Sequence, residues 1–260
     1  MPTLRAADPT RTIRIVSDAA ALSQAVAEQC VTLTMRQARA RGRVSVALSG
    51  GSTAQPLYTL LAREPYRTRM PWDRLHVFWG DERCVPADHP ESNFRMARDA
   101  LLSRVPLPPA NIHRVPVEQG DPHTVALAYE RILRGWFSGD AAAAPLFDLV
   151  FLGLGADGHT ASLFPRSDAL RERSRWVVAS SGGTPRCPRV TLTIPALNRA
   201  RQLIWLIAGS PKAAAVRAIL EGPVVPDDLP AQQIRPVHAA PLWLLDRAAA
   251  ARLRKASGRA

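Results

Sequence analysis

An acid and an imidazole lie two residues apart on a glycine-rich turn in this 260-residue chain. The apolar run 149–152 before the turn has the length and composition of one buried strand. Three glycines after it allow the backbone to turn sharply and approach a ligand closely. Asp157 and His159 therefore stand where open α/β sheets carry their chemistry. We expect His159 to act as a general base.

The same turn, Gly153-Leu-Gly-Ala-Asp-Gly158, also matches the G-x-G-x-x-G pattern of dinucleotide-binding loops. That pattern is informative only when a long helix follows and an acid closes the next strand about 20 residues on. Here Pro165 comes too early for such a helix, and the next strand candidate, 176–179, ends in Ser-Ser-Gly-Gly. We therefore expect no nicotinamide, flavin or other cofactor.

A second glycine turn follows the apolar strand candidate 44–48 and precedes a helix expected from about 54 to 63. Backbone N–H groups and the helix dipole at such a turn favour an anion. The turn lacks the Gly-Lys-Ser/Thr of a nucleotide-hydrolysing loop. The sequence thus favours phosphate binding at this turn, with a capped turn that holds no ligand as the alternative. The turn consists of Ser49, Gly50, Gly51, Ser52 and Thr53.

Two further strand candidates end in charged residues. The strand 203–207 runs into a turn with Lys212 in the first turn of the next helix, where a cation is disfavoured unless an anion is bound. The strand 76–80 ends in Asp81-Glu82-Arg83, which is either a site or a surface ion network.

Composition excludes several classes of protein. Hydrophobic residues make up 47% of the chain, and the longest apolar runs are shorter than the roughly 18 residues of a membrane span. The first residues lack an apolar signal core, so we expect a cytoplasmic protein without a membrane partner. The net charge of +12 comes mostly from scattered arginines, so we expect no nucleic-acid partner either. Three widely spaced cysteines and six unpaired histidines predict no metal site.

Strands alternate with helices along nearly the whole chain, which predicts an α/β fold with a mostly parallel, Rossmann-like sheet covered by helices on both faces. We expect a single domain over 1–260, with a core at about 13–250 and frayed ends at 1–12 and 252–260. The alanine tract in 139–145 is expected to be a linker within that domain. The glycines and prolines of 180–188 suit a loop that closes over a ligand.

Six ordered motifs make the chain resemble the 6-phosphogluconolactonases. The resemblance runs from about residue 15 to 250. The motifs are Ser49-Gly-Gly-Ser-Thr, Gly80-Asp-Glu-Arg with Ser92-Asn93, the turn 153–165, Arg189-Val-Thr-Leu-Thr, Ser210-Pro-Lys-Ala, and Leu229-Pro-Ala-Gln-Gln-Ile-Arg-Pro with Trp243-Leu-Leu-Asp.

This resemblance implies a fold shared with glucosamine-6-phosphate deaminases and ribose-5-phosphate isomerases. It implies hydrolysis of 6-phospho-D-glucono-1,5-lactone, a phosphorylated sugar lactone, by a monomer or small homo-oligomer without metal or nucleotide. His159 would activate water and Asp157 would orient His159 or a substrate hydroxyl. The phosphate would lie on the 49–53 turn, and the remaining substrate-binding candidates are Asp81, Arg83, Arg189 and Lys212.

Other interpretations stay open at this point. Arg189 could be an ordinary strand-end arginine, Asp157 a turn residue and His159 a structural histidine. Amino-sugar-phosphate deaminases or isomerases of the same fold carry Ala-Phe-Asn-Glu-Pro near the Asp-Gly-His, whereas this chain has Thr-Ala-Ser-Leu-Phe-Pro. A sugar-phosphate sensor would need a DNA-binding helix-turn-helix, for which the residues before the first strand leave no room.

Overall fold

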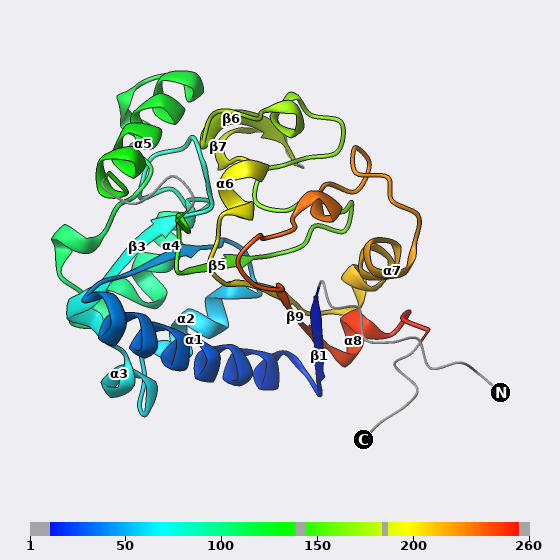
Figure 1. The fold of residues 1–260 in the computed structure, drawn as a ribbon, viewed down its shortest axis with the longest axis horizontal. Helices are drawn as coiled ribbons and strands as arrows, with labels where there is room; N and C mark the ends of the chain where they lie inside the picture. Colours follow the sequence, from blue (N-terminus) through cyan, green and yellow to red (C-terminus); the bar gives the residue numbers. More distant parts are fainter. Residues whose placement is uncertain (1–10, 139–143, 184–186, 255–260) are drawn as a thin grey trace.

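The computed structural model describes residues 11–138, 144–183 and 187–254. In this part of the chain six parallel strands form the main sheet (Figure 1). Their spatial order is β3 (Leu75–Trp79), β2 (Val44–Leu48), β5 (Leu149–Leu152), β8 (Leu203–Ile207), β9 (Leu242–Asp246) and β1 (Thr12–Val16). The expected α/β class with a mostly parallel sheet is confirmed.

The strand order reverses between β2 and β5. From β2 the chain continues outward to β3, whereas from β5 it continues outward in the other direction through β8 to β9. Open α/β sheets bind ligands at the carboxyl ends of the strands beside such a reversal. The turns that follow β2 and β5 are the 49–53 turn and the turn that contains His159.

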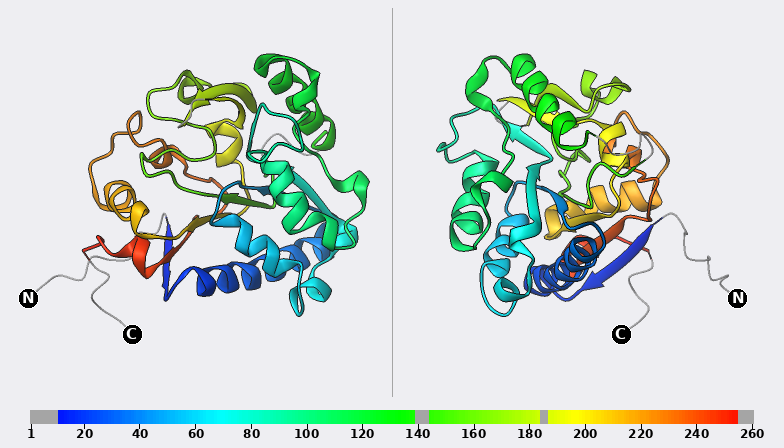
Figure 2. Two further views of the ribbon diagram at one scale, coloured as in Figure 1. Left: turned by 180° about the vertical axis from the view of Figure 1, so that it is seen from behind. Right: turned by 60° about the vertical axis from the view of Figure 1, so that its left-hand side comes forward.

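The helices form where caps and apolar positions predict them. The Asp18 side chain accepts a hydrogen bond from the N–H of Ala21 at the start of α1, and Gly42 ends α1 in the left-handed conformation. Helix α1 packs against the main sheet and α5 against a smaller sheet, on opposite sides of the molecule (Figures 1 and 2). The helices are α1 (Ala19–Arg41), α2 (Ala54–Leu61), α3 (Tyr66–Arg69), α4 (Asn93–Ala100), α5 (Pro122–Trp136), α6 (Ile194–Asn198), α7 (Ala213–Glu221) and α8 (Arg247–Ala250).

The smaller sheet was not expected. Within the described residues it contains three antiparallel strands in the order β4 (Asp81–Arg83), β7 (Cys187–Leu192) and β6 (Val177–Gly182). Residues 81–83, which the sequence placed at the end of the preceding strand, form a short strand of their own, because β7 supplies backbone partners for them. The two ends of the expected 180–188 loop belong to strands β6 and β7. Its residues 184–186 lie outside the described part.

Some residues that were expected to be frayed make defined contacts. Thr12 already pairs with Leu242 in the main sheet, and the Arg254 N–H donates to the Glu221 carboxylate at 3.0 Å. Leu253 packs against the core between these contacts. Residues 1–10 and 255–260 and most of the alanine tract lie outside the described residues.

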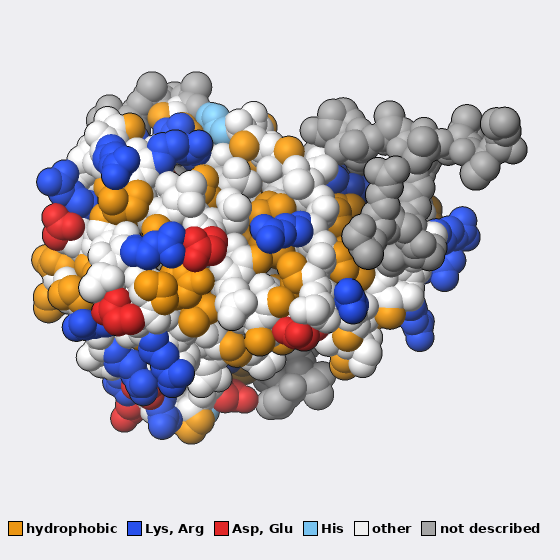
Figure 3. Space-filling view, turned by 90° about the horizontal axis from the view of Figure 1, so that it is seen from below, with side chains coloured by type: hydrophobic (Ala, Val, Ile, Leu, Met, Phe, Trp, Pro, Cys, Tyr) orange, Lys and Arg blue, Asp and Glu red, His pale blue; other side chains and the backbone are white. Residues whose placement is uncertain are grey.

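Charges are mixed on the surface seen from below. In that view arginine and lysine side chains are scattered among acidic and apolar ones (Figure 3). The helices of the described residues are all too short or too polar to cross a membrane.

Candidate functional site

Turns from both sheets meet at one cavity of about 180 Å³. It is lined by every expected site residue except Asp157, namely Ser49, Gly50, Gly51, Ser52, Thr53, Asp81, Arg83, His159, Arg189 and Lys212. The parallel sheet brings the turns after β2, β5 and β8 to one edge, and the small sheet adds Arg83 and Arg189. The expected convergence of these residues is thus observed.

Asp157 does not line the cavity, but its carboxylate forms a hydrogen bond with the ring of His159. The distance between Asp157 Oδ1 and His159 Nδ1 is 2.5 Å, and the same oxygen accepts the His159 backbone N–H at 3.2 Å. The hydrogen bond from the imidazole keeps the pKa of the Asp157 carboxyl below its usual value. An ionised carboxylate has no proton to give, so Nδ1 carries the proton in this pair. The neutral ring then has its lone pair on Nε2, the nitrogen a general base needs.

Glycine is required next to this pair. A Cβ at Gly155 would lie 2.1 Å from His159 Nδ1 and 2.4 Å from Asp157 Oδ1, so any side chain there would displace both groups. Gly158 has φ of 86°, a conformation that other residues rarely adopt. Both glycines belong to the turn that the sequence suggested. Gly155 leaves room for the imidazole, and Gly158 allows the backbone to turn.

The cations of the cavity have no anionic partner among the residues that the structure describes. Arg83, Arg189 and Lys212 form no salt bridge with any carboxylate of the described residues. Arg83 and Arg189 face each other across β4 and β7, and the Nε atom of each is buried without a hydrogen-bond partner. Like charges directly opposite each other in a sheet are destabilising. An anion in the cavity would relieve that cost.

The 49–53 turn offers backbone donors in front of α2. Gly51 adopts φ of 92°, and its carbonyl oxygen accepts the N–H groups of Ala54 and Gln55, which begins the helix. The N–H groups of Gly51, Ser52 and Thr53 donate to no acceptor in the described part of the chain. A helix start with unused donors suits a phosphate.

Three further residues at the site belong to the quoted motifs but were not expected to have a role there. Phe164 lies between His159 and Arg189, with its ring centroid 4.7 Å from the imidazole and 5.4 Å from the guanidinium carbon. Ser162 is fully buried and donates to Asp81 Oδ2 at 2.6 Å. Asn93 lines the cavity from the start of α4. Their place in the motifs was the available signal, but their contacts are tertiary and could not be read from the sequence.

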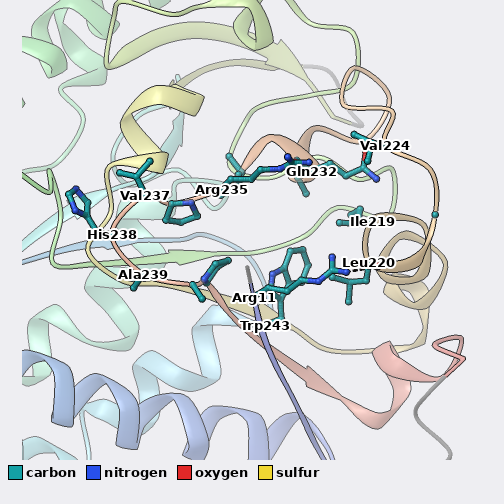
Figure 4. Close-up of a pocket in the computed structure, with 16 residues that line it drawn as sticks. Arg11, Ile219, Leu220, Val224, Gln232, Arg235, Val237, His238, Ala239 and Trp243 are labelled. Carbon is teal, nitrogen blue, oxygen red and sulfur yellow. Dashed lines mark hydrogen bonds between the residues drawn. The ribbon is translucent and has the colours of Figure 1, made fainter. Parts of the chain in front are cut away.

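A larger cavity of about 580 Å³ lies elsewhere, between α7, β9 and the segment around residues 230–241 (Figure 4). Its basic lining residues are Arg11, Arg235 and His238, and no Asp or Glu lines it. His238 therefore has no carboxylate there to orient it. Size favours this second cavity, but the acid–imidazole pair and the unpaired cations identify the smaller one as the candidate active site.

Comparisons with known proteins identify the family of the chain. Residues 17–243 match the family model of glucosamine-6-phosphate isomerases/6-phosphogluconolactonase. A 6-phosphogluconolactonase of Synechocystis sp. is 46% identical over 226 residues, which cover 86% of this chain and 91% of the relative. The structure of 6-phosphogluconolactonase from Trypanosoma cruzi matches with a TM-score of 0.83 and 32% identity, covering 95% of this chain and 98% of that one.

A monomeric glucosamine-6-phosphate deaminase matches with a TM-score of 0.78 at 22% identity, over 93% of this chain and 99% of that one, which shows a shared fold. The family model and the 46% identical relative both extend over most of the chain. The chain therefore belongs to the glucosamine-6-phosphate isomerase/6-phosphogluconolactonase family.

Proposed function

We propose that this protein hydrolyses 6-phospho-D-glucono-1,5-lactone to 6-phospho-D-gluconate, the second step of the oxidative pentose phosphate pathway. The observation that carries the proposal is one cavity that combines unpaired cations with a carboxylate-oriented imidazole. The names of the relatives support the same reaction. The proposed setting is the cytoplasm, and the proposed active form is a monomer or small homo-oligomer.

The phosphate group of the substrate lies on the 49–53 turn in this proposal. The free N–H groups of that turn and the cations Arg83, Arg189 and Lys212 surround it. Arginine forks bind phosphate oxygens in a bidentate manner, so the two arginines of the small sheet fix its orientation. The phosphate thereby places the lactone ring toward His159.

His159 Nε2 takes a proton from a water molecule, and the water oxygen attacks the lactone carbonyl carbon. The tetrahedral intermediate collapses with cleavage of the bond between that carbon and the ring oxygen. The imidazolium returns its proton to the ring oxygen, so water is consumed and one free carboxylic acid forms. A positioned base of this kind contributes about 10²–10⁴-fold to the rate.

Asp157 keeps His159 in the required tautomer. Its carboxylate accepts the Nδ1 proton before the reaction and stabilises the imidazolium that forms during it. The oxyanion of the intermediate needs nearby donors, which backbone N–H groups or an arginine of the cavity would supply.

The test follows acid release from freshly prepared lactone, with spontaneous hydrolysis subtracted. We expect rapid hydrolysis by the wild type and a loss of about 10²–10⁴-fold in His159→Ala. His238→Ala is the matched control, because His238 lines the other cavity (Figure 4). Circular dichroism and thermal unfolding establish that each variant is folded.

Each alternative has its own result in this assay. Equal rates for the wild type and a folded His159→Ala would make His159 structural and refute the proposed base. A wild type that leaves the lactone unchanged but releases ammonium from glucosamine 6-phosphate would be a deaminase. A wild type that acts on neither compound but binds sugar phosphates would be a sensor.

A further inference from the structure

Glu82 is a buried carboxylate beside the candidate active site, although it does not line the cavity. Its side chain accepts the backbone N–H groups of Arg83, Asn93 and Phe94 at 2.7–2.8 Å. It also accepts the hydroxyl of Ser92 at 3.2 Å. Burial raises the pKa of this carboxyl, and the three N–H groups oppose the rise. Glu82 thus joins β4, which carries Arg83, to the first residues of α4.

Asn93 is the residue through which this connection reaches the cavity. Its Nδ2 donates to the Asp81 carbonyl oxygen at 2.9 Å, which fixes the plane of the amide. Its Oδ1 receives no hydrogen bond from the described residues, and the residue is only 3% exposed. A Cβ at Gly50 would lie 2.0 Å from that oxygen. The amide oxygen therefore occupies the space that glycine leaves open in the 49–53 turn.

Asn93 lines the cavity, and its Oδ1 is not one of the buried side-chain atoms that lack a hydrogen-bond partner, so this oxygen is open to the cavity. A ligand in the cavity can therefore supply the donor that the described residues do not. At neutral pH a phosphate monoester is mostly a dianion without a proton to donate, so the phosphate group of the substrate cannot satisfy Asn93 Oδ1. The hydroxyl groups of a sugar are donors. This acceptor next to a phosphate-binding turn is therefore suited to the sugar part of a sugar phosphate.

We propose that Asn93 Oδ1 accepts a hydrogen bond from a hydroxyl group of the bound sugar, and that Glu82 is the positioning residue that holds Asn93 in place. The inference deepens the proposed function and rests on it. It gives Asn93 the task of distinguishing a phosphorylated sugar from phosphate alone.

Asn93→Ala tests the contact by calorimetric titration with two probes, 6-phosphogluconate and methyl phosphate, a monoester without sugar hydroxyl groups. We expect the Kd for 6-phosphogluconate to rise about 5- to 10-fold, the effect of losing one hydrogen bond, and the Kd for methyl phosphate to change less than about 2-fold. Asn111→Ala is the matched control, since Asn111 is also buried but lies outside the cavity. Equal changes for both probes, or no change, would overturn the inference.

Two coupled variants test the positioning. Gly50→Ala would push the Asn93 amide out of place, so it should weaken 6-phosphogluconate binding in the wild type more than in Asn93→Ala. Glu82→Gln should likewise raise KM for the lactone in the wild type and add little to Asn93→Ala. If the fold-change in binding or KM of each double variant equals the product of the two single fold-changes, neither Gly50 nor Glu82 acts through Asn93. If Glu82→Gln does not fold, the Asn93→Ala and Gly50→Ala pair decides the question.

Failure of the inference differs from failure of the proposed function. Lactone hydrolysis with unchanged KM and unchanged 6-phosphogluconate binding in Asn93→Ala would overturn the inference alone. A wild type without lactonase activity whose 6-phosphogluconate binding depends on Asn93 would overturn the proposed reaction and support the sugar contact.

Discussion

Two charged clusters lie at opposite ends of the same three parallel strands, β2, β5 and β8. At the amino ends Asp148 accepts hydrogen bonds from Arg41 at 3.0 Å and Arg201 at 3.1 Å. It also accepts the backbone N–H and the hydroxyl of Ser45 at 3.0 and 3.1 Å. At the carboxyl ends the cations Arg83, Arg189 and Lys212 have no carboxylate partner within the described residues.

The difference separates charges that hold the sheet together from charges that await a ligand. The Asp148 side chain is 2% exposed, and each of its oxygens has two donors. The arginines of the cavity instead keep buried Nε atoms without partners. Proteins accept such local costs at functional sites, where a bound ligand offsets them. Substitutions at the two ends should therefore affect different measurements.

The largest effect is expected for Asp148→Ala, measured as the free energy of unfolding. Removing one partner of a buried ion pair costs about 3–5 kcal/mol. We expect about 3 kcal/mol, because Arg41 and Arg201 are 26% and 34% exposed and can regain water. Lactone hydrolysis per folded molecule should not change.

The fully exposed acid Asp168 provides the control, since Asp168→Ala should cost less than about 0.5 kcal/mol. A large loss of catalytic activity in folded Asp148→Ala would contradict the separation of the two clusters. So would an unfolding free energy equal to that of the wild type.

The sequence predicted the turns of the site better than its cation pair. Glycine and serine after an apolar strand identify an anion-binding turn locally, and a parallel sheet brings such turns to one edge. The pairing of Arg83 with Arg189 depends on a three-residue strand that has no periodicity of its own. Only the tertiary contact with β7 makes 81–83 a strand, so the sequence indicated no more than the charged end of the strand before it.

The stabilising cluster was also missed. Asp148 lies between Phe147 and the apolar strand β5, where a charged residue needs partners. Its partners come from the end of α1, from β2 and from the residues before β8, more than 50 positions away on either side. Sequence alone could have indicated a buried acid there but not which arginines neutralise it. The role of Asn93 was missed for the same reason, because its contact with Gly50 is tertiary.

A smaller effect is expected for Arg189→Met. In contrast to Asp148→Ala, this substitution should impair substrate binding and leave stability intact. The loss of hydrogen bonds to a charged group should raise KM for the lactone about 10- to 100-fold. The free energy of unfolding should stay the same or rise by up to about 1 kcal/mol, since Arg83 loses a like charge across β4 and β7. Steady-state kinetics and urea unfolding measure the two quantities.

Arg171→Met serves as the control for this change, because Arg171 is 80% exposed and pairs with Asp168. It should alter neither KM nor unfolding. A marked loss of stability in Arg189→Met would mean that Arg189 is a structural arginine of the small sheet and not one that awaits an anion.

The smallest effect is expected for Lys212→Met, and its two parts should have opposite signs. Lys212 immediately precedes α7, where the positive end of the helix dipole disfavours a cation. Without ligand, the substitution should raise the free energy of unfolding by about 0.3–1 kcal/mol. With 6-phosphogluconate at saturation this advantage should shrink or reverse, because the variant binds the phosphate less tightly and gains less stability from it. Thermal unfolding with and without ligand measures both parts, and a variant less stable than the wild type without ligand would show that Lys212 already has a stabilising role in the empty protein.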